Sequence, residues 1–141
     1  SKDEYNKVKL HVQLAEEILK DRVEPRVLEI AIAHHERLDG SGYPRGLRDN
    51  EMSRSQKILQ VADMVCALIN PRSYHPIRTK EQVVAILREE TEKYRLSKEV
   101  TDALIFFYDG IMQKVATRCT EVRSLYGRIQ DQYEHVLKKF S

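Results

Sequence analysis

Apolar residues recur along most of the chain at spacings of three and four, which predicts helices. No segment shows the clean alternation of a strand. We expect helices over residues 4–20, 25–38, 53–69, 79–94, 97–111 and 111–140. Pro25 suits a first helical position, Ser53 and Ser97 are N-cap candidates, and Thr79-Lys80-Glu81-Gln82 is a capping-box pattern. The predicted fold class is therefore all-α.

Residues 39–52 interrupt this pattern with a glycine-rich loop. The loop follows His34 and His35, which continue the apolar stripe of the helix before it. Because neighbouring residues of a helix diverge by about 100°, we expect the two imidazoles to flank a pocket without reaching one ion in the same way. The loop is either an ordinary connection or a stiffened element that presents backbone N–H groups and Tyr43 beside the histidines.

Two more polar residues lie on apolar helix faces. His11 shares the apolar stripe of residues 4–20, which is typical of a core histidine that is bonded to a carbonyl oxygen, and also of a ligand. Asp63 is flanked by core positions of its helix, where a carboxylate is costly unless it is paired or bound to a metal. Pairing with Arg37 is the simple alternative for Asp63.

Composition adds limits rather than a function. The 141 residues, 41% hydrophobic and 33% charged, suit a single helical domain. A formal charge of +2 gives no reason to expect a nucleic-acid polymer as partner. No apolar run is long enough to span a membrane. Cys66 and Cys119 lack metal-finger spacing, and we expect them to be reduced in a cytoplasmic protein.

The stretch His34-His35-Glu36-Arg37-Leu38-Asp39-Gly40-Ser41-Gly42-Tyr43-Pro44 resembles the signature of the HD-GYP family, bacterial metal-dependent phosphodiesterases that cleave cyclic di-GMP. The resemblance implies an HD-domain-like helical bundle, incomplete at its N-terminus, over residues 1–110. Residues 111–141 would then form an additional C-terminal helix. The resemblance further implies that a divalent ion (Fe, Mn or Zn) is held by four ligands, which are His11, His34, His35 and Asp63.

The same resemblance implies a phosphate-binding region. Arg72 and His75 stand where the family has basic residues that hold a substrate phosphate, and we expect Tyr43 to contribute to the same region. The carried-over residues of the motif loop are Glu36, Arg37, Asp39, Gly40, Gly42 and Pro44. The chain departs from the family in several places: it has no His-Asp dipeptide, Cys66 and Ser73 replace the usual Asp and Pro, and the second basic residue of the phosphate-binding loop is His75.

Phosphodiester hydrolysis at such sites uses two metal ions that share a bridging ligand. Three histidines and one carboxylate suffice for one ion, but not for two. We therefore expect a module of cyclic di-GMP signalling that is not catalytic by itself and that retains one metal or phosphate-ligand site, or none. The alternative is an active phosphodiesterase whose His-Asp half lies upstream of Ser1 or in a partner chain, since a start at Ser rather than Met suggests a fragment.

A third hypothesis is a helical dimerisation module with a relic site. Apolar residues recur at heptad spacing along the C-terminal helix: Val115, Cys119, Val122, Tyr126, Ile129, Tyr133, Val136 and Phe140. This pattern predicts either packing on the chain's own domain or a homodimer through residues 115–140. A missing N-terminal half that covers residues 8–38 is the other expected partner, and a cyclic dinucleotide is the expected ligand.

Overall fold

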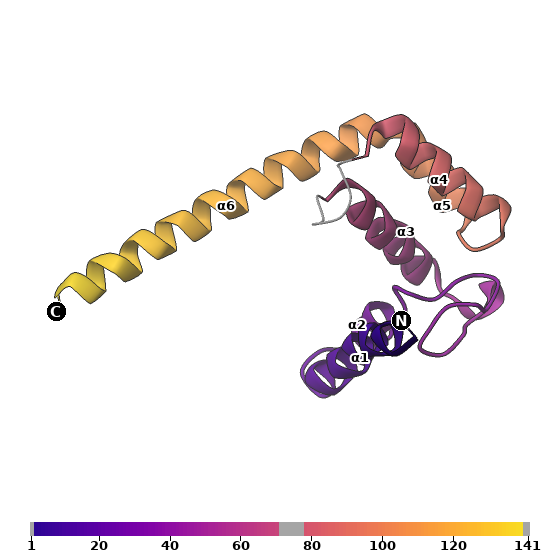
Figure 1. Ribbon diagram of the computed structural model, residues 1–141, viewed down its shortest axis with the longest axis horizontal. Coiled ribbons are helices and arrows are strands. Elements are labelled where there is room, and N and C mark those ends of the chain that lie inside the picture. The colour runs from indigo at the N-terminus through magenta and orange to yellow at the C-terminus, as the bar shows by residue number, and fades with distance from the viewer. Residues whose placement is uncertain (1, 71–77, 140–141) are drawn as a thin grey trace. The chain divides into compact units, whose positions relative to one another are not determined.

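The computed structural model describes residues 2–70 and 78–139 of the chain, with side chains described for residues 9–70, 78–122 and 124–130. These residues form α-helices and one short 3-10 helix, and no strand occurs among them (Figure 1). The elements are α1 (Lys2–Leu19), α2 (Pro25–Ile32), η1 (Asp49–Glu51), α3 (Arg54–Ile69), α4 (Lys80–Glu92), α5 (Lys98–Phe106) and α6 (Tyr108–Lys139). The predicted all-α fold class is confirmed.

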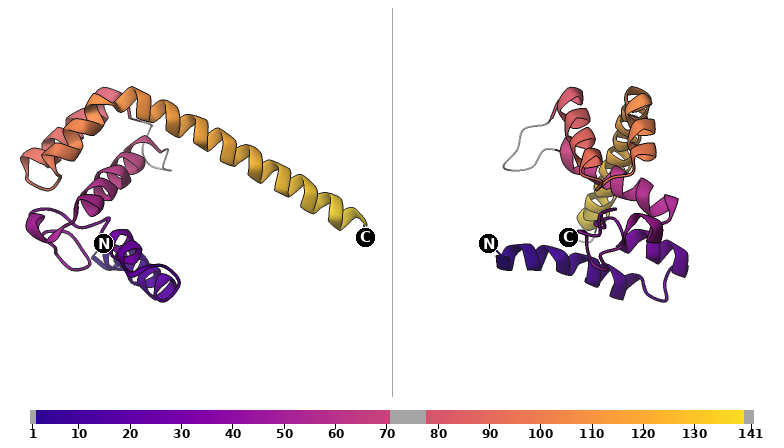
Figure 2. Two further views of the ribbon diagram at one scale, coloured as in Figure 1. Left: turned by 180° about the vertical axis from the view of Figure 1, so that it is seen from behind. Right: turned by 90° about the vertical axis from the view of Figure 1, so that its right-hand side faces the viewer.

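The chain divides into two compact units, Ser1–Ala103 and Leu104–Ser141. In the first unit α1 packs on α2, α2 on α3, and α3 on α4 (Figure 2). The buried apolar side chains of this unit come from the helices, from the residues between α2 and α3, and from the turn between α4 and α5. They are Val12, Ile32, Ala33, Leu38, Met52, Val61, Val65, Val83, Leu87 and Leu96. No helix among the described residues has the length and apolar character needed to cross a membrane.

Two helix starts follow the predicted capping boxes. The Ser53 hydroxyl accepts from the Gln56 N–H at 3.3 Å, and the Gln56 side chain accepts from the Ser53 N–H at 2.7 Å. Thr79 and Gln82 make the same reciprocal pair at 3.4 and 3.0 Å. Each pair satisfies N–H groups that have no partner inside the helix, so α3 and α4 begin where the sequence indicates.

Helix α2 is shorter than predicted, because it ends at Ile32 and not at residue 38. A tight turn follows, in which the Glu36 N–H donates to the Ala33 carbonyl at 3.0 Å. Glu36 is fully buried and binds backbone N–H groups farther along the loop. These contacts draw the chain away from the helix axis and outweigh the modest local preference for continuing the helix.

Helix α1 does not bury His11, although this residue shares the apolar stripe of the predicted helix. Val12 is fully buried, whereas His11 is exposed and Ile18 is 56% exposed. Leu10 and Leu14 are also about half exposed. The reason is that α2 is the helix that packs on α1 among the described residues, which leaves the other apolar positions of α1 uncovered.

Helix α6 begins at Tyr108, three residues before the predicted start. The predicted boundary lay next to Gly110, but a glycine only weakens a helix by about 1 kcal/mol and does not end it. Helix α5 ends at Phe106, so Phe107 separates the two helices.

Candidate metal centre

Three imidazoles from two parts of the chain converge in the first unit. His11 lies on α1, whereas His34 and His35 follow the end of α2. The Nε2 atom of His11 lies 3.2 Å from Nε2 of His34 and 3.1 Å from Nε2 of His35. One ligand atom from each residue lies within 4.8 Å of the other two. Both adjacent histidines lie beyond the end of α2, so the 100° spacing of a helix does not describe how their rings diverge.

The two separations that involve His11 fit a shared divalent ion. Two nitrogen ligands, each about 2.1 Å from an ion, are about 3.0 Å apart at a right angle and about 3.4 Å apart at the tetrahedral angle. The two measured separations, 3.1 and 3.2 Å, fall between these values. Imidazole nitrogens suit Zn, Fe and related ions. His11, His34 and His35 would therefore hold one ion from one side, and they leave its other positions to further ligands.

The outer partner of His34 fixes the form of its ring. Its Nδ1 atom lies 2.6 Å from the carbonyl oxygen of Ala31, in the last turn of α2. Because a carbonyl oxygen only accepts, Nδ1 is the protonated nitrogen, and in the neutral ring Nε2 has the free lone pair. Hydrogen bonds of this kind are typical of metal-binding histidines.

Asp63, on α3, lies on the other side of the His35 ring. Its Oδ2 atom is 3.8 Å from Nδ1 of His35, the nitrogen that faces away from His11. This separation is too long for a hydrogen bond, and the predicted role of Asp63 as a direct ligand stays a prediction. Burial and the nearby His34 lower the pKa of His35 to about 4, although Asp63 acts in the opposite direction. The ring is therefore neutral near pH 7, which is the form that binds a metal.

The loop that follows is held by the carboxylate of Glu36. Its Oε1 accepts from the Arg45 N–H at 2.7 Å and its Oε2 from the Leu47 N–H at 2.8 Å. The Tyr43 N–H donates to the carbonyl of His35 at 3.2 Å, and the peptide bond between Tyr43 and Pro44 is cis. Glu36 therefore organises the loop and does not point to the three imidazoles as a ligand would.

Two glycines of the motif are required by this geometry. A Cβ atom on Gly42 would lie 2.3 Å from the backbone nitrogen of Arg37, so only glycine allows this close approach. Gly40 has a φ of +81°, in the left-handed region. Between them, Asp39 Oδ1 accepts from both the N–H and the hydroxyl of Ser41, at 2.9 and 2.6 Å. The motif thus encodes a tightly closed loop.

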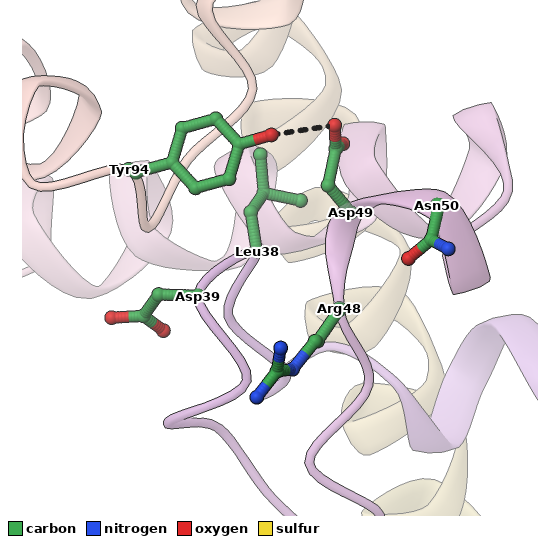
Figure 3. A pocket seen from close by; sticks show the side chains of 6 residues that line it. All are labelled: Leu38, Asp39, Arg48, Asp49, Asn50 and Tyr94. Atoms are coloured by element: carbon green, nitrogen blue, oxygen red, sulfur yellow. Dashed lines mark hydrogen bonds between the residues drawn. The ribbon is translucent and has the colours of Figure 1, made fainter.

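The far end of the loop is bonded to the turn between α4 and α5 (Figure 3). The hydroxyl of Tyr94 donates to Oδ2 of Asp49 at 2.9 Å, and the Leu38 N–H donates to the carbonyl of Arg95 at 3.1 Å. Lys57 approaches the other oxygen of Asp49 to 2.5 Å. The bonds from Lys57 and Tyr94 hold the pKa of Asp49 below its usual value.

A cavity of about 460 Å³ opens beside His35, between the loop and the turn after α4. Side chains that line it include His35, Arg37, Ser41, Tyr43, Glu90 and Arg95. The Tyr43 ring lies 4.7 Å from that of His35, and the Lys9 ammonium lies 5.3 Å from the centre of the Tyr43 ring. The sequence indicates Tyr43 and Arg37 but gives no signal for Arg95, which belongs to no motif.

Arg72 and His75, the predicted phosphate-binding residues, lie outside the described residues. The other predicted site residues all lie in the first unit, around the three histidines or along the loop after them.

Comparison with known proteins identifies the class. A family model described as the HD domain matches residues 1–100. The chain therefore belongs to the HD domain family, which confirms the HD-GYP resemblance of its signature.

Several curated relatives share this region. A 3'3'-cGAMP-specific phosphodiesterase of Vibrio cholerae is 40% identical over 79 residues, which is 56% of this chain and 18% of that protein. A cyclic di-GMP phosphodiesterase of Thermotoga maritima is 34% identical over 113 residues, 71% of this chain and 31% of the relative. The cyclic di-GMP phosphodiesterase response regulator of Xanthomonas campestris is 36% identical over 91 residues, 62% of this chain and 24% of the relative. The chain spans less than a third of the length of each of these relatives.

Proposed function

We propose that this chain is a metal-binding HD-GYP-type module of cyclic dinucleotide signalling, with one divalent ion held by His11, His34 and His35. The observation that supports the proposal most strongly is the convergence of three imidazoles. Nε2 of His11 lies 3.2 Å from Nε2 of His34 and 3.1 Å from Nε2 of His35. The names of the relatives, phosphodiesterases of cyclic di-GMP and cGAMP, indicate the ligand class. A bound ion in such a site polarises a phosphate oxygen as a Lewis acid.

We further propose that the chain by itself does not hydrolyse cyclic di-GMP. The sequence contains no His-Asp dipeptide, and Cys66 replaces a carboxylate that the family has one turn after Asp63. Two ions need several protein ligands each and a group that bridges them. The three histidines and Asp63 provide enough donors for one ion only.

Two free, exposed cysteines are in keeping with action in the cytoplasm.

Elemental analysis tests the metal site. The purified chain is dialysed without chelator, and its Fe, Mn and Zn contents are measured. We expect a single ion per chain, lost in His34→Ala and in the double variant with His35→Ala, and kept in His135→Gln, which changes a histidine of α6. A low metal content that does not respond to His34→Ala would contradict the proposed site.

A hydrolysis assay tests the second part. We expect no turnover of cyclic di-GMP by the chain with added Mn or Fe, and measurable turnover would overturn the proposal. The alternative, an active phosphodiesterase that is completed by a His-Asp half from elsewhere, predicts that a polypeptide containing His-Asp-x-x-Lys restores turnover to this chain.

Homodimerisation through α6 is a second candidate function, and the exposure of the helix supports it. Val115, Val122, Tyr126 and Ile129 lie at heptad positions and are 38%, 51%, 69% and 52% exposed. Cys119, at another heptad position, is also exposed, and the remaining seam residues lie in residues 131–141, whose side chains are not described. Light scattering of the purified chain tests this candidate, and a monomer at high concentration would exclude it.

A further inference from the structure

Two arginines line the cavity beside His35, and only one of them is paired with carboxylates among the described residues. Arg37 donates from Nη1 to the Glu36 carbonyl at 3.2 Å. Among the described residues, no carboxylate lies within ion-pair distance of Arg37, and the rest of its guanidinium makes no hydrogen bond. Arg37 is therefore a cation that faces a cavity without a matching anion.

Arg95 lines the same cavity but is held by two carboxylates. Its Nε lies 3.4 Å from Oδ2 of Asp39, and its Nη1 lies 3.5 Å from each carboxylate oxygen of Glu90. These long contacts engage Nε and Nη1, while Nη2 has no partner among the described residues. Arg95 is thus a positioned donor whose own charge is largely balanced.

The position of the cavity connects it to the metal centre. His35 contributes Nε2 to the three-histidine cluster, and the same side chain lines the cavity. The volume of about 460 Å³ lies within the range of about 300–1,000 Å³ that is usual for sites of small ligands. The planar fork of a guanidinium matches the oxygens of a phosphate group. A ligand that reached the cluster with one group would thus extend toward Arg37.

We infer that this cavity is a phosphate subsite, with Arg37 as its main contact and Arg95 as its second. The inference rests on the proposed function, since it places one phosphate group of the cyclic dinucleotide next to the three histidines. Free phosphate has the same chemistry, so the subsite should also bind inorganic phosphate alone. The simplest competing explanation is that both arginines only stabilise the loop.

The test measures inorganic phosphate binding by phosphorus NMR for the wild-type chain, Arg37→Gln and Arg88→Gln. Arg88 is an exposed arginine of α4, so its variant makes the same charge change away from the cavity. Loss of a charge-assisted bond predicts that Arg37→Gln weakens phosphate binding about tenfold or more. We expect Arg88→Gln to leave it unchanged. Equal affinity in Arg37→Gln and the wild type, or no phosphate binding by the wild type, would overturn the inference.

Two further measurements separate this result from other failures. Metal content is measured on each sample, and we expect it to be equal in all three. Arg37→Lys keeps the charge without the planar fork of the guanidinium, so we expect intermediate phosphate affinity even if Arg37→Gln folds poorly.

Cyclic di-GMP is titrated in parallel. If phosphate binding depends on Arg37 but cyclic di-GMP does not bind, the subsite stands and the proposed function fails. If cyclic di-GMP binds the wild type and Arg37→Gln equally, the subsite fails and the proposed function stands.

Discussion

His34 donates from Nδ1 to the carbonyl oxygen of Ala31, 2.6 Å away in the last turn of α2. The carbonyl is available because the helix ends at Ile32 and the residues after it turn away. The end of the helix thus fixes the orientation of the imidazole and presents Nε2 to His11 at 3.2 Å. The geometry of the candidate metal centre depends on where α2 stops.

Asp63 lies 3.8 Å from Nδ1 of His35, and we expect it to act in metal binding either as a ligand or as an outer partner of His35. In Asp63→Asn the charge beside Nδ1 of His35 is lost, so we expect metal affinity to fall about 10- to 100-fold. Competition with a chromophoric chelator measures the affinity. Asp102→Asn, at an exposed position of α5, is the control and should not change it. Unchanged affinity in Asp63→Asn would exclude Asp63 both as a ligand and as an outer partner.

Glu36 is predicted to be the main stabilising residue of the loop. In Glu36→Gln the new amide NH₂ group must face one of the two N–H donors, of Arg45 or Leu47, and leaves it buried without an acceptor. We expect the free energy of unfolding to fall by about 1–3 kcal/mol, as measured by urea titration. Glu29→Gln, on the exposed side of α2, should change it by less than about 0.5 kcal/mol. Equal effects would mean that the loop does not depend on this carboxylate.

Replacing glycine by alanine should have opposite effects on the free energy of unfolding at Gly42 and at Gly127. The Cβ of Gly42→Ala would collide with the backbone of Glu36 and Arg37, so we expect a loss of about 1–3 kcal/mol. Gly127 is in the middle of α6, and a Cβ atom added there would meet nothing within 4 Å, so Gly127→Ala should gain about 0.5–1 kcal/mol. Urea unfolding followed by circular dichroism measures both. A neutral Gly42→Ala would show that the loop tolerates a wider separation of its two backbone segments.

The sequence predicts the helices well where local chemistry determines them. Ser53 and Thr79 start α3 and α4 through side chains that lie within three residues of the N–H groups they bind. The sequence does not predict the end of α2 correctly, because contacts between Glu36 and residues nine and eleven positions later decide that boundary. The same nonlocal folding places Nε2 of His34 and of His35 beside His11, an arrangement that helix spacing alone does not describe. Arg95 could not be found from the sequence, since only the turn after α4 brings it beside the loop.

Asp49 should make stability depend on pH in the acidic range. Hydrogen bonds from Lys57, and then from Tyr94, hold its pKa below the usual value of 3.8. Because the folded-state pKa is the lower one, its stabilising contribution is complete above the unfolded value and is lost as pH falls through the folded value. We expect the stability difference between the wild type and Asp49→Asn to shrink as pH falls below about 4. Tyr94→Phe removes one of the two bonds and should show a smaller difference of the same sign. Urea unfolding at several pH values measures this, and a constant difference would contradict it.

The exposed face of α6 allows a prediction about its partner. In a parallel, in-register pair of helices, residues at seam positions face their own copies, so Cys119 would lie next to Cys119 of a second chain. We expect a Cys66→Ser chain to form a covalent dimer through Cys119 on mild oxidation, as judged by non-reducing gel electrophoresis. Val122→Lys, at the seam, should abolish the dimer and the crosslink, whereas Thr117→Lys, on the opposite side of the helix, should leave both. Metal content should stay the same in every variant, since the three histidines belong to the other unit. A dimer in light scattering without a crosslink would indicate antiparallel helices, and a monomer throughout would leave α6 without this role.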